Sequence, residues 1–184
     1  MFTHVDIDLG KDLETIRSAD YSVRTLSAIH SNIVNPEYDY APSLCKENTT
    51  IQQLWWDNEL DYTTDLRLDW TAVESQLGMH IITASSILLP PGNVIPWHTD
   101  TFVKMKRLHP ERNDFVRAMI YVTEYEPGQV TQIRNGTGLE TYTNWTPGSG
   151  YMIDDTVPHV NINGSNKPVI TINYSGFLMP LKRI

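Results

Sequence analysis

Short strand-like segments recur through the second half of the chain, and they restrict the fold more than any other feature of the sequence. From residue 80 onward, apolar runs rich in β-branched residues alternate with turn signals. No amphipathic helical pattern separates them, so the crossover helices that parallel strands need are missing. The pattern predicts an antiparallel jelly roll or sandwich. The expected strands are residues 81–89, 94–97, 115–122, 129–134, 139–145, 151–153 and 169–174.

Two local signals add detail to this β region. Asn135-Gly136 is a strong hairpin dipeptide because both residues tolerate the positive φ angles of a tight turn, so it should join the two flanking strands. Pro96 has no N–H group for a sheet ladder. The segment around Pro96 is therefore expected not to be a central strand.

The first 79 residues have a mixed, largely helical pattern. We expect a short strand over residues 2–8, and a helix that is capped within residues 48–50 and runs through residues 51–56. Other expected elements are a helix over 12–18, a short element over 23–29, a loop over 35–42, and a helix that begins at Asp69 or Thr71 and stops at Gly78. These helices should pack on one outer face of the β unit.

Length and composition describe one globular domain over residues 1–184, comprising the mixed region 1–79, the β core 80–176 and a C-terminal tail 177–184. A formal net charge of -8 argues against a nucleic-acid partner, since such proteins usually carry a basic surface. The single cysteine, Cys45, excludes an intrachain disulfide and fits a reducing compartment. We see neither a secretory signal nor an apolar run long enough for a membrane, so we expect a cytoplasmic location. The sequence predicts no oligomeric state.

His98 and Asp100 follow directly after the apolar segment 94–97. Residues i and i+2 of an extended chain point to the same side, so an imidazole and a carboxylate can meet at one point there. That geometry suits a metal ion. A surface histidine and aspartate that cap a turn are the alternative interpretation of the same pattern.

A third ligand would have to come from elsewhere in the chain. His109 lies in a charged segment, whereas His159 follows a strand-like run far beyond Asp100. In a double-sheet roll such distant segments can pair, so His159 can face His98. Two imidazoles and one carboxylate with open positions make the facial triad of non-heme Fe(II) oxygenases.

Four motifs follow one another in the second half of the chain. They are Pro-Pro-Gly-x-x-Ile-Pro-x-His-x-Asp at 90–100, the strand 116–122, Trp-x-Pro-Gly at 145–148, and Asp154-Asp155 before His159. In this order they resemble the motifs of the Fe(II)/2-oxoglutarate-dependent oxygenases, in particular the aspartyl/asparaginyl β-hydroxylase-like members and small prolyl-hydroxylase-like members carried by phages. The resemblance covers residues 80 to 176, roughly half the chain.

This resemblance implies a double-stranded β-helix, the jelly-roll or cupin-like fold. It also implies an Fe(II)- and 2-oxoglutarate-dependent dioxygenase that hydroxylates a C–H bond of a peptidyl side chain or a small molecule. Fe(II) would be held by His98, Asp100 and His159, with 2-oxoglutarate as co-substrate. The location would be the cytoplasm of a bacterium, or of the infected host for a phage-encoded protein.

One position departs from the family. Residue 169 is valine where many members carry the arginine or lysine that holds the C5 carboxylate of 2-oxoglutarate, although Thr171 keeps a hydroxyl. We expect Arg117 and Thr171 together to receive this carboxylate, because a guanidinium suits bidentate carboxylate binding. Arg117 could instead form a salt bridge at the barrel mouth, and Lys167 is the other candidate, although it could simply lie in a solvated turn. Tyr121 and Asn173 could face the same cavity or be packed strand residues.

Two further questions stay open at this level. The basic run that contains Lys104, Lys106, Arg107 and Arg112 is either a solvated loop or a lid over the iron site that contacts an acidic substrate. The chain as a whole is either the hydroxylase or a jelly-roll metal- or ligand-binding protein without oxidative turnover. The intact triad favours the hydroxylase, and the valine at residue 169 gives weight to the binding protein.

Overall fold

The computed structural model describes residues 1–21, 25–27, 50–57 and 68–179, and these form two antiparallel β-sheets with three helices. The larger sheet contains β1 (Phe2–Asp6), β2 (Thr25–Ser27), β3 (Thr50–Asp57), β4 (Met79–Leu89), β6 (Phe115–Tyr121), β9 (Ser149–Ile153) and β11 (Val169–Leu178). The smaller sheet contains β5 (Asn93–His98), β7 (Gln129–Asn135), β8 (Gly138–Tyr142) and β10 (His159–Asn163). The helices are α1 (Asp12–Arg17), α3 (Trp70–Leu77) and α4 (Val103–Leu108).

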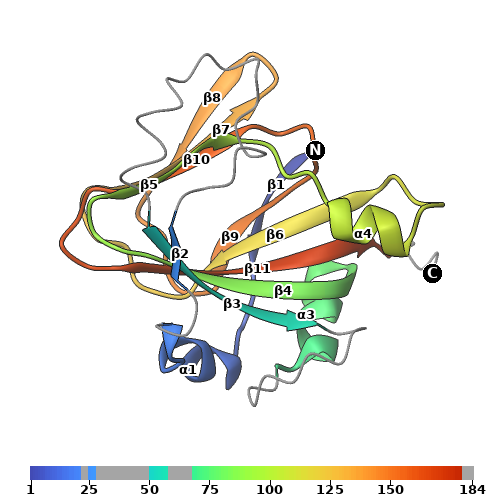
Figure 1. The fold of residues 1–184 in the computed structure, drawn as a ribbon, viewed down its shortest axis with the longest axis horizontal. Coiled ribbons are helices and arrows are strands. Elements are labelled where there is room, and N and C mark those ends of the chain that lie inside the picture. Colours follow the sequence, from blue (N-terminus) through green and yellow to red (C-terminus); the bar gives the residue numbers. More distant parts are fainter. Residues whose placement is uncertain (22–24, 28–49, 58–67, 180–184) are drawn as a thin grey trace.

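The strand order confirms the predicted jelly roll. The larger sheet has the order β1-β9-β6-β11-β4-β3-β2 and the smaller one β5-β10-β7-β8. Many strands that are consecutive in the sequence are therefore not adjacent in a sheet. The smaller sheet lies on one side of the larger sheet, and α1 and α3 lie on the other side (Figure 1). The fold therefore has an interior between the sheets and a second core beneath the helices.

Strand β11 shows how the larger sheet divides these two environments. Ile170, Ile172 and Tyr174 belong to the apolar cluster that also contains Ile16 of α1 and Val73 of α3. We call the side that they occupy the outer face. The intervening residues Thr171, Asn173 and Ser175 are buried polar side chains, and alternation places them on the inner face, toward the smaller sheet.

The two helices beneath the outer face begin and end near the predicted residues. In α3, the Asp69 carboxylate accepts a hydrogen bond from the Ala72 backbone N–H at 3.3 Å, so Asp69 rather than Thr71 is the N-cap. Gly78 ends the helix with φ of 63°, in the left-handed region that favours glycine. Glu74 accepts a hydrogen bond from the Ile81 N–H at 2.7 Å and so ties the helix to the start of β4.

The prediction of a helix over residues 51–56 is wrong, because these residues form β3. This strand pairs with β4 from Gln52 to Asp57 and with β2 on its other edge. A short apolar run has no decisive period, and the backbone partners offered by β2 and β4 decide its structure. The described part of the first 78 residues therefore contributes the three strands β1, β2 and β3 to the larger sheet as well as helices. The predicted loop over 35–42 lies outside the described residues.

Four further details of the β region can be compared with the predictions. β5 is at the edge of its sheet, as Pro96 predicted, and β7 and β8 form the hairpin predicted from Asn135-Gly136, with φ of 60° at Gly136. Strand β11 extends to Leu178, past the predicted start of the tail. The strand β10, which begins at His159, was not predicted. Among the described helices, none has the length and apolarity that a bilayer span requires.

Candidate metal centre

His98 and His159 are brought together by strand pairing. His98 is the last residue of β5 and His159 the first of β10, and the two residues are partners in the antiparallel register. Their ring centroids are 4.2 Å apart. Asp100 follows β5 by two residues, and one potential ligand atom from each of the three side chains lies within 4.8 Å of the others. All three residues are buried, so the arrangement forms a compact set of donors inside the protein.

Backbone carbonyl groups orient both imidazole rings. Nδ1 of His98 lies 2.7 Å from the carbonyl oxygen of Pro96, and Nδ1 of His159 lies 3.2 Å from that of Val157. A carbonyl oxygen can only accept a hydrogen bond, so each contact selects the tautomer protonated at Nδ1. Nε2 of each ring then has a free lone pair for a metal, the arrangement usual for metal-binding histidines.

The two oxygens of the Asp100 carboxylate have different surroundings. Oδ1 accepts a hydrogen bond from Nη1 of Arg117, whereas Oδ2 is buried and has no hydrogen-bond partner among the described residues. A buried carboxylate oxygen without a partner is costly, so this atom is a candidate ligand for a cation. Two Nε2 atoms and one carboxylate oxygen fit a divalent metal of the two-histidine, one-carboxylate type.

The protonation states suit a metal as well. Burial lowers the pKa of His98 and lowers the pKa of His159 to about 3, so both rings are neutral at neutral pH. Burial alone would raise the pKa of Asp100, but Arg117 and the two histidines more than offset it and the pKa is lowered. The site therefore presents two neutral imidazoles and an ionised carboxylate, the forms that bind metal ions.

Arg117 lies beside this centre on β6. Its Nε donates a hydrogen bond to Ser175 Oγ at 2.9 Å, and its side chain is 24% exposed. Its guanidinium carbon is 5.5 Å from the centroid of the Phe102 ring. The contact with Asp100 matches the salt-bridge interpretation of Arg117; whether it also holds 2-oxoglutarate stays a prediction.

The structure does not bring Arg117 next to Thr171. Arg117 is the register partner of Ser175, whereas Thr171 is the register partner of Tyr121. The two pairs are four residues apart along the strands, which corresponds to about 13 Å. Asn173 lies between them, and its Nδ2 donates to the Ser85 carbonyl oxygen at 3.3 Å.

A chain of hydrogen bonds crosses the interior below His159. The Tyr121 hydroxyl donates to Thr131 Oγ1 at 2.6 Å, and Thr131 Oγ1 donates to Asn161 Oδ1 at 2.7 Å. Thr131 and Asn161 are interior polar residues that were not predicted from the sequence. Asn161 is two residues beyond His159 and shares its side of β10, so a correct prediction of that strand would have found it.

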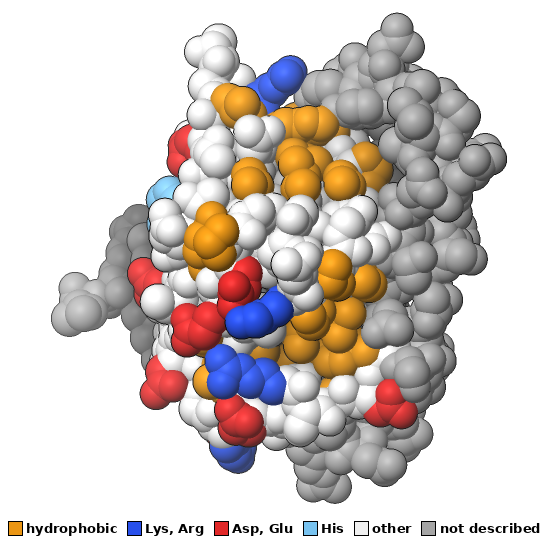
Figure 2. Space-filling view, turned by 90° about the vertical axis from the view of Figure 1, so that its left-hand side faces the viewer, with side chains coloured by type: hydrophobic (Ala, Val, Ile, Leu, Met, Phe, Trp, Pro, Cys, Tyr) orange, Lys and Arg blue, Asp and Glu red, His pale blue; other side chains and the backbone are white. Residues whose placement is uncertain are grey.

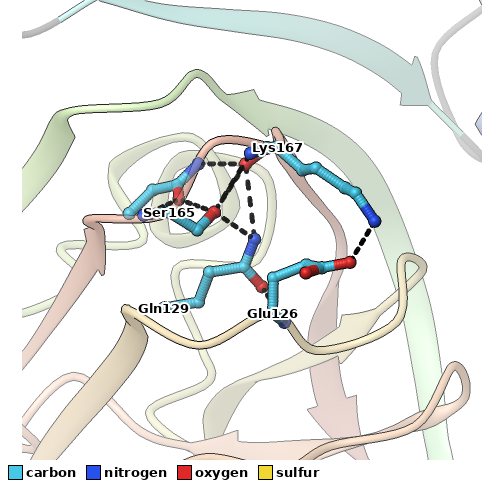
Figure 3. Close-up of polar contacts among 5 residues, drawn as sticks. Glu126, Gln129, Ser165 and Lys167 are labelled. Atoms are coloured by element: carbon cyan, nitrogen blue, oxygen red, sulfur yellow. Dashed lines mark hydrogen bonds and ion pairs between the residues drawn. The ribbon is translucent and has the colours of Figure 1, made fainter.

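Lys167 lies in the connection between β10 and β11, away from the metal ligands. Its Nζ forms an ion pair with Glu126, and its side chain is 68% exposed (Figure 3). Its backbone carbonyl accepts hydrogen bonds from Ser165 Oγ at 2.9 Å and Asn163 Nδ2 at 2.8 Å. Asn163 ends β10 and His159 begins it, so Lys167 is at the end of the roll opposite the metal ligands.

The surface at the side of the β10–β11 connection carries charges of both signs. Figure 2 views the molecule from the left-hand side of Figure 1, where this connection lies. Acidic and basic side chains stand next to each other at this face, and hydrophobic side chains gather in two groups beside them. The described part of this face therefore presents no block of a single charge.

The basic run after Asp100 forms a helix for part of its length. Met105 of α4 is buried in a cluster with Phe102 and Phe115, so this segment is not simply a solvated loop. Lys106 Nζ lies 2.7 Å from Asp155 Oδ2, which links α4 to the segment that precedes His159. The role of this segment as a lid stays a prediction.

One comparison with a solved structure supports the fold. A prolyl-4-hydroxylase from Pseudomonas putida has a TM-score of 0.56 at 18% identity, and the match covers 97% of this chain and 92% of that one. A 2OG-Fe(II) oxygenase family oxidoreductase from Burkholderia pseudomallei has a TM-score of 0.47 at 10% identity over 70% of this chain and 68% of its own. A cupin domain from Bordetella pertussis has a TM-score of 0.35 at 17% identity, over 51% and 79% of the two chains. No family model and no curated relative matches the sequence.

Proposed function

We propose that the chain is an Fe(II)- and 2-oxoglutarate-dependent dioxygenase that hydroxylates a C–H bond of a peptidyl side chain or a small molecule. The observation that carries the proposal is the convergence of His98, Asp100 and His159, with the buried Asp100 Oδ2 lacking a partner in the described structure. The likeness in fold to a prolyl-4-hydroxylase supports it.

The ligand set determines what chemistry this site can perform. Fe(II) would be held by Nε2 of both histidines and by Asp100, which leaves three positions of an octahedral ion for co-substrate and dioxygen. The bound ion would supply oxidative decarboxylation of 2-oxoglutarate coupled to hydroxylation of the substrate. The protein orients the ligands through the Pro96 and Val157 carbonyls, and its buried surroundings limit access of water.

The proposed position of the co-substrate rests on the polar residues of the inner face. Thr171 and Tyr121 are register partners, and along the strands they lie further from Asp100 than the Arg117–Ser175 pair does. Arg117 is held at Asp100 and Ser175, about 13 Å along the strands from Thr171. We therefore place the distal part of 2-oxoglutarate near Thr171 and Tyr121, with Asn173 beside them.

A metal- or ligand-binding protein without oxidative turnover is the second candidate. Val169 is buried in the interior apolar cluster at the position where the family resemblance calls for a cation. Lys167 is directed to Glu126 and not to the interior. A buried carboxylate needs a paired cation or several hydrogen bonds, so weak binding of 2-oxoglutarate would favour this candidate.

An anaerobic Fe(II) titration tests the metal centre. Asp100→Ala should weaken Fe(II) binding by about a hundredfold or more, because it removes both a ligand and the compensating negative charge. Asp155→Ala is the matched control, since it removes a negative charge near the site without removing a ligand. Equal Fe(II) affinity in the Asp100 variant and the wild type would contradict the assignment.

Turnover separates the two candidate functions. Succinate release from 2-oxoglutarate, with Fe(II) and oxygen but without a primary substrate, is expected for the oxygenase. Anaerobic binding of 2-oxoglutarate should be measured in parallel, because an oxygenase can hold its co-substrate without consuming it until the primary substrate arrives. Tight Fe(II) binding with neither succinate release nor 2-oxoglutarate binding would favour the protein without turnover.

A further inference from the structure

Arg117 has contacts on three sides, and all of them lie at the metal end of the roll. Nη1 contacts Asp100 Oδ1, and Nε contacts Ser175 Oγ at 2.9 Å. The Phe102 ring lies on a further side, with its centroid 5.5 Å from the guanidinium carbon, within the range of a cation–π contact. The guanidinium is therefore held in one orientation by groups from β11 and from the segment after β5.

The backbone after Asp100 contributes to this arrangement. Phe102 has φ of 49°, a left-handed conformation that is unfavourable for a bulky residue. Its side chain is nevertheless buried, 4% exposed, in the cluster with Met105 and Phe115. Such a conformation persists only where surrounding contacts determine it, and here it keeps the aromatic ring close to Arg117.

The contact with Arg117 affects how the Asp100 carboxylate can bind a metal. Because Arg117 occupies Oδ1, Oδ2 is the carboxylate oxygen of Asp100 that has no described partner. A carboxylate with both oxygens free could chelate a metal through both. A carboxylate whose Oδ1 already accepts a hydrogen bond from a guanidinium binds the metal through its other oxygen alone. This preserves the open coordination positions of the metal that a co-substrate needs.

We infer that Arg117 is a positioning residue of the metal centre: it holds Asp100 so that Oδ2 alone faces the metal, and Ser175 and Phe102 hold Arg117 in turn. This inference rests on the proposed metal centre. It assigns Arg117 to the orientation of a metal ligand and leaves the distal carboxylate of 2-oxoglutarate to other residues.

Cobalt(II) without any co-substrate is the probe that tests this role. The visible absorption of bound Co(II) depends on its coordination number and geometry, so it reports how Asp100 binds. Removing a cation near a metal should by itself tighten metal binding, and loss of orientation should weaken it, so Arg117→Met combines opposite effects on affinity. Arg117→Lys keeps the charge but loses the planar fork that bridges Asp100 and Ser175.

Both variants should change the Co(II) spectrum in the absence of 2-oxoglutarate. Arg117→Lys should also weaken Co(II) binding by about tenfold or more, as usual for loss of a partner that orients a ligand. Ser175→Ala should change the spectrum in the same direction by a smaller amount, and it provides a second test if an Arg117 variant does not fold. The matched control is the same pair of substitutions at the exposed Arg134 of β7, which should leave the spectrum unchanged.

The outcomes separate three cases. Wild-type spectra and Co(II) affinities in the Arg117 and Ser175 variants would overturn the inference. If 2-oxoglutarate binding alone were then weakened in the Arg117 variants, Arg117 would be the co-substrate anchor predicted from the sequence. Failure of the wild-type protein itself to bind Co(II) or Fe(II) would instead count against the proposed function.

Discussion

The outer and inner faces of the larger sheet come from the same strands but have opposite compositions. Along β11, the outer face carries Ile170, Ile172 and Tyr174 in the cluster beneath α1 and α3. The inner face carries Thr171, Asn173 and Ser175, which are buried as well. Both faces of the strand are thus removed from solvent, and only the chemistry of the buried groups differs.

This difference separates residues that stabilise the fold from residues that serve the site. Burying apolar surface stabilises a protein by roughly 25 cal/mol per Å², so the outer face can be understood from stability alone. A buried polar group contributes little net stability even when it is hydrogen-bonded, and it is costly when it is not. The buried Asp100 Oδ2, which has no described partner beside His98 and His159, is therefore explained by the proposed metal and not by stability.

The largest effect on stability is expected on the outer face. Ile172 is fully buried there, and Ile172→Ala should lower the free energy of unfolding by about 3–4 kcal/mol through lost burial and the resulting cavity. Denaturant unfolding of the metal-free protein measures the change. Ile162 of β10 is only partly buried, so Ile162→Ala is the matched control and should cost clearly less. Equal losses at the two positions would contradict the assignment of Ile172 to the apolar core of the outer face.

A substitution on the inner face should weaken 2-oxoglutarate binding and leave the free energy of unfolding almost unchanged. Thr171→Val keeps the shape of the side chain, so the free energy of unfolding should change by less than about 1 kcal/mol. Binding of 2-oxoglutarate should weaken by about tenfold or more, because a hydrogen bond to a charged group is worth about 1.5–3 kcal/mol. Anaerobic titration of the Fe(II)-loaded protein measures the binding.

Thr137→Val, at an exposed position of the hairpin turn, is the control for that experiment and should change neither quantity. Unaltered 2-oxoglutarate binding in the Thr171 variant would show that the co-substrate does not reach this part of the inner face.

The smallest effect is expected at the end of the roll opposite the metal ligands. Lys167 is 68% exposed in its ion pair with Glu126, and surface pairs of this kind contribute about 0–1 kcal/mol. Lys167→Ala should change both the free energy of unfolding and 2-oxoglutarate binding only slightly. Glu126→Ala should behave in the same way, as the other half of the pair. A large loss of 2-oxoglutarate binding in the Lys167 variant alone would identify Lys167 as the anchor.

The sequence was sufficient for features that depend on neighbouring residues. Alternation along an extended chain predicted that His98 and Asp100 meet at one point, and the geometry of proline and of Asn-Gly located the edge strand and the hairpin. The end of α3 at Gly78 and its start at one of two capping candidates, Asp69 or Thr71, were predicted because capping hydrogen bonds involve residues within one helical turn. Steric and hydrogen-bonding preferences of this range are contained in the local sequence.

Features that depend on distant partners were decided only by the tertiary structure. Residues 51–56 are compatible with a helix, and they are a strand because β2 and β4 supply backbone partners on both edges. The local sequence likewise did not reveal β10, whose pairing with β5 and β7 sets His159 opposite His98. The contact of Arg117 with Asp100 depends on how β6 packs beside the end of β5. These strand pairings and side-chain contacts depend on burial and hydrogen bonding summed over the whole fold, so no single segment of the sequence determines them.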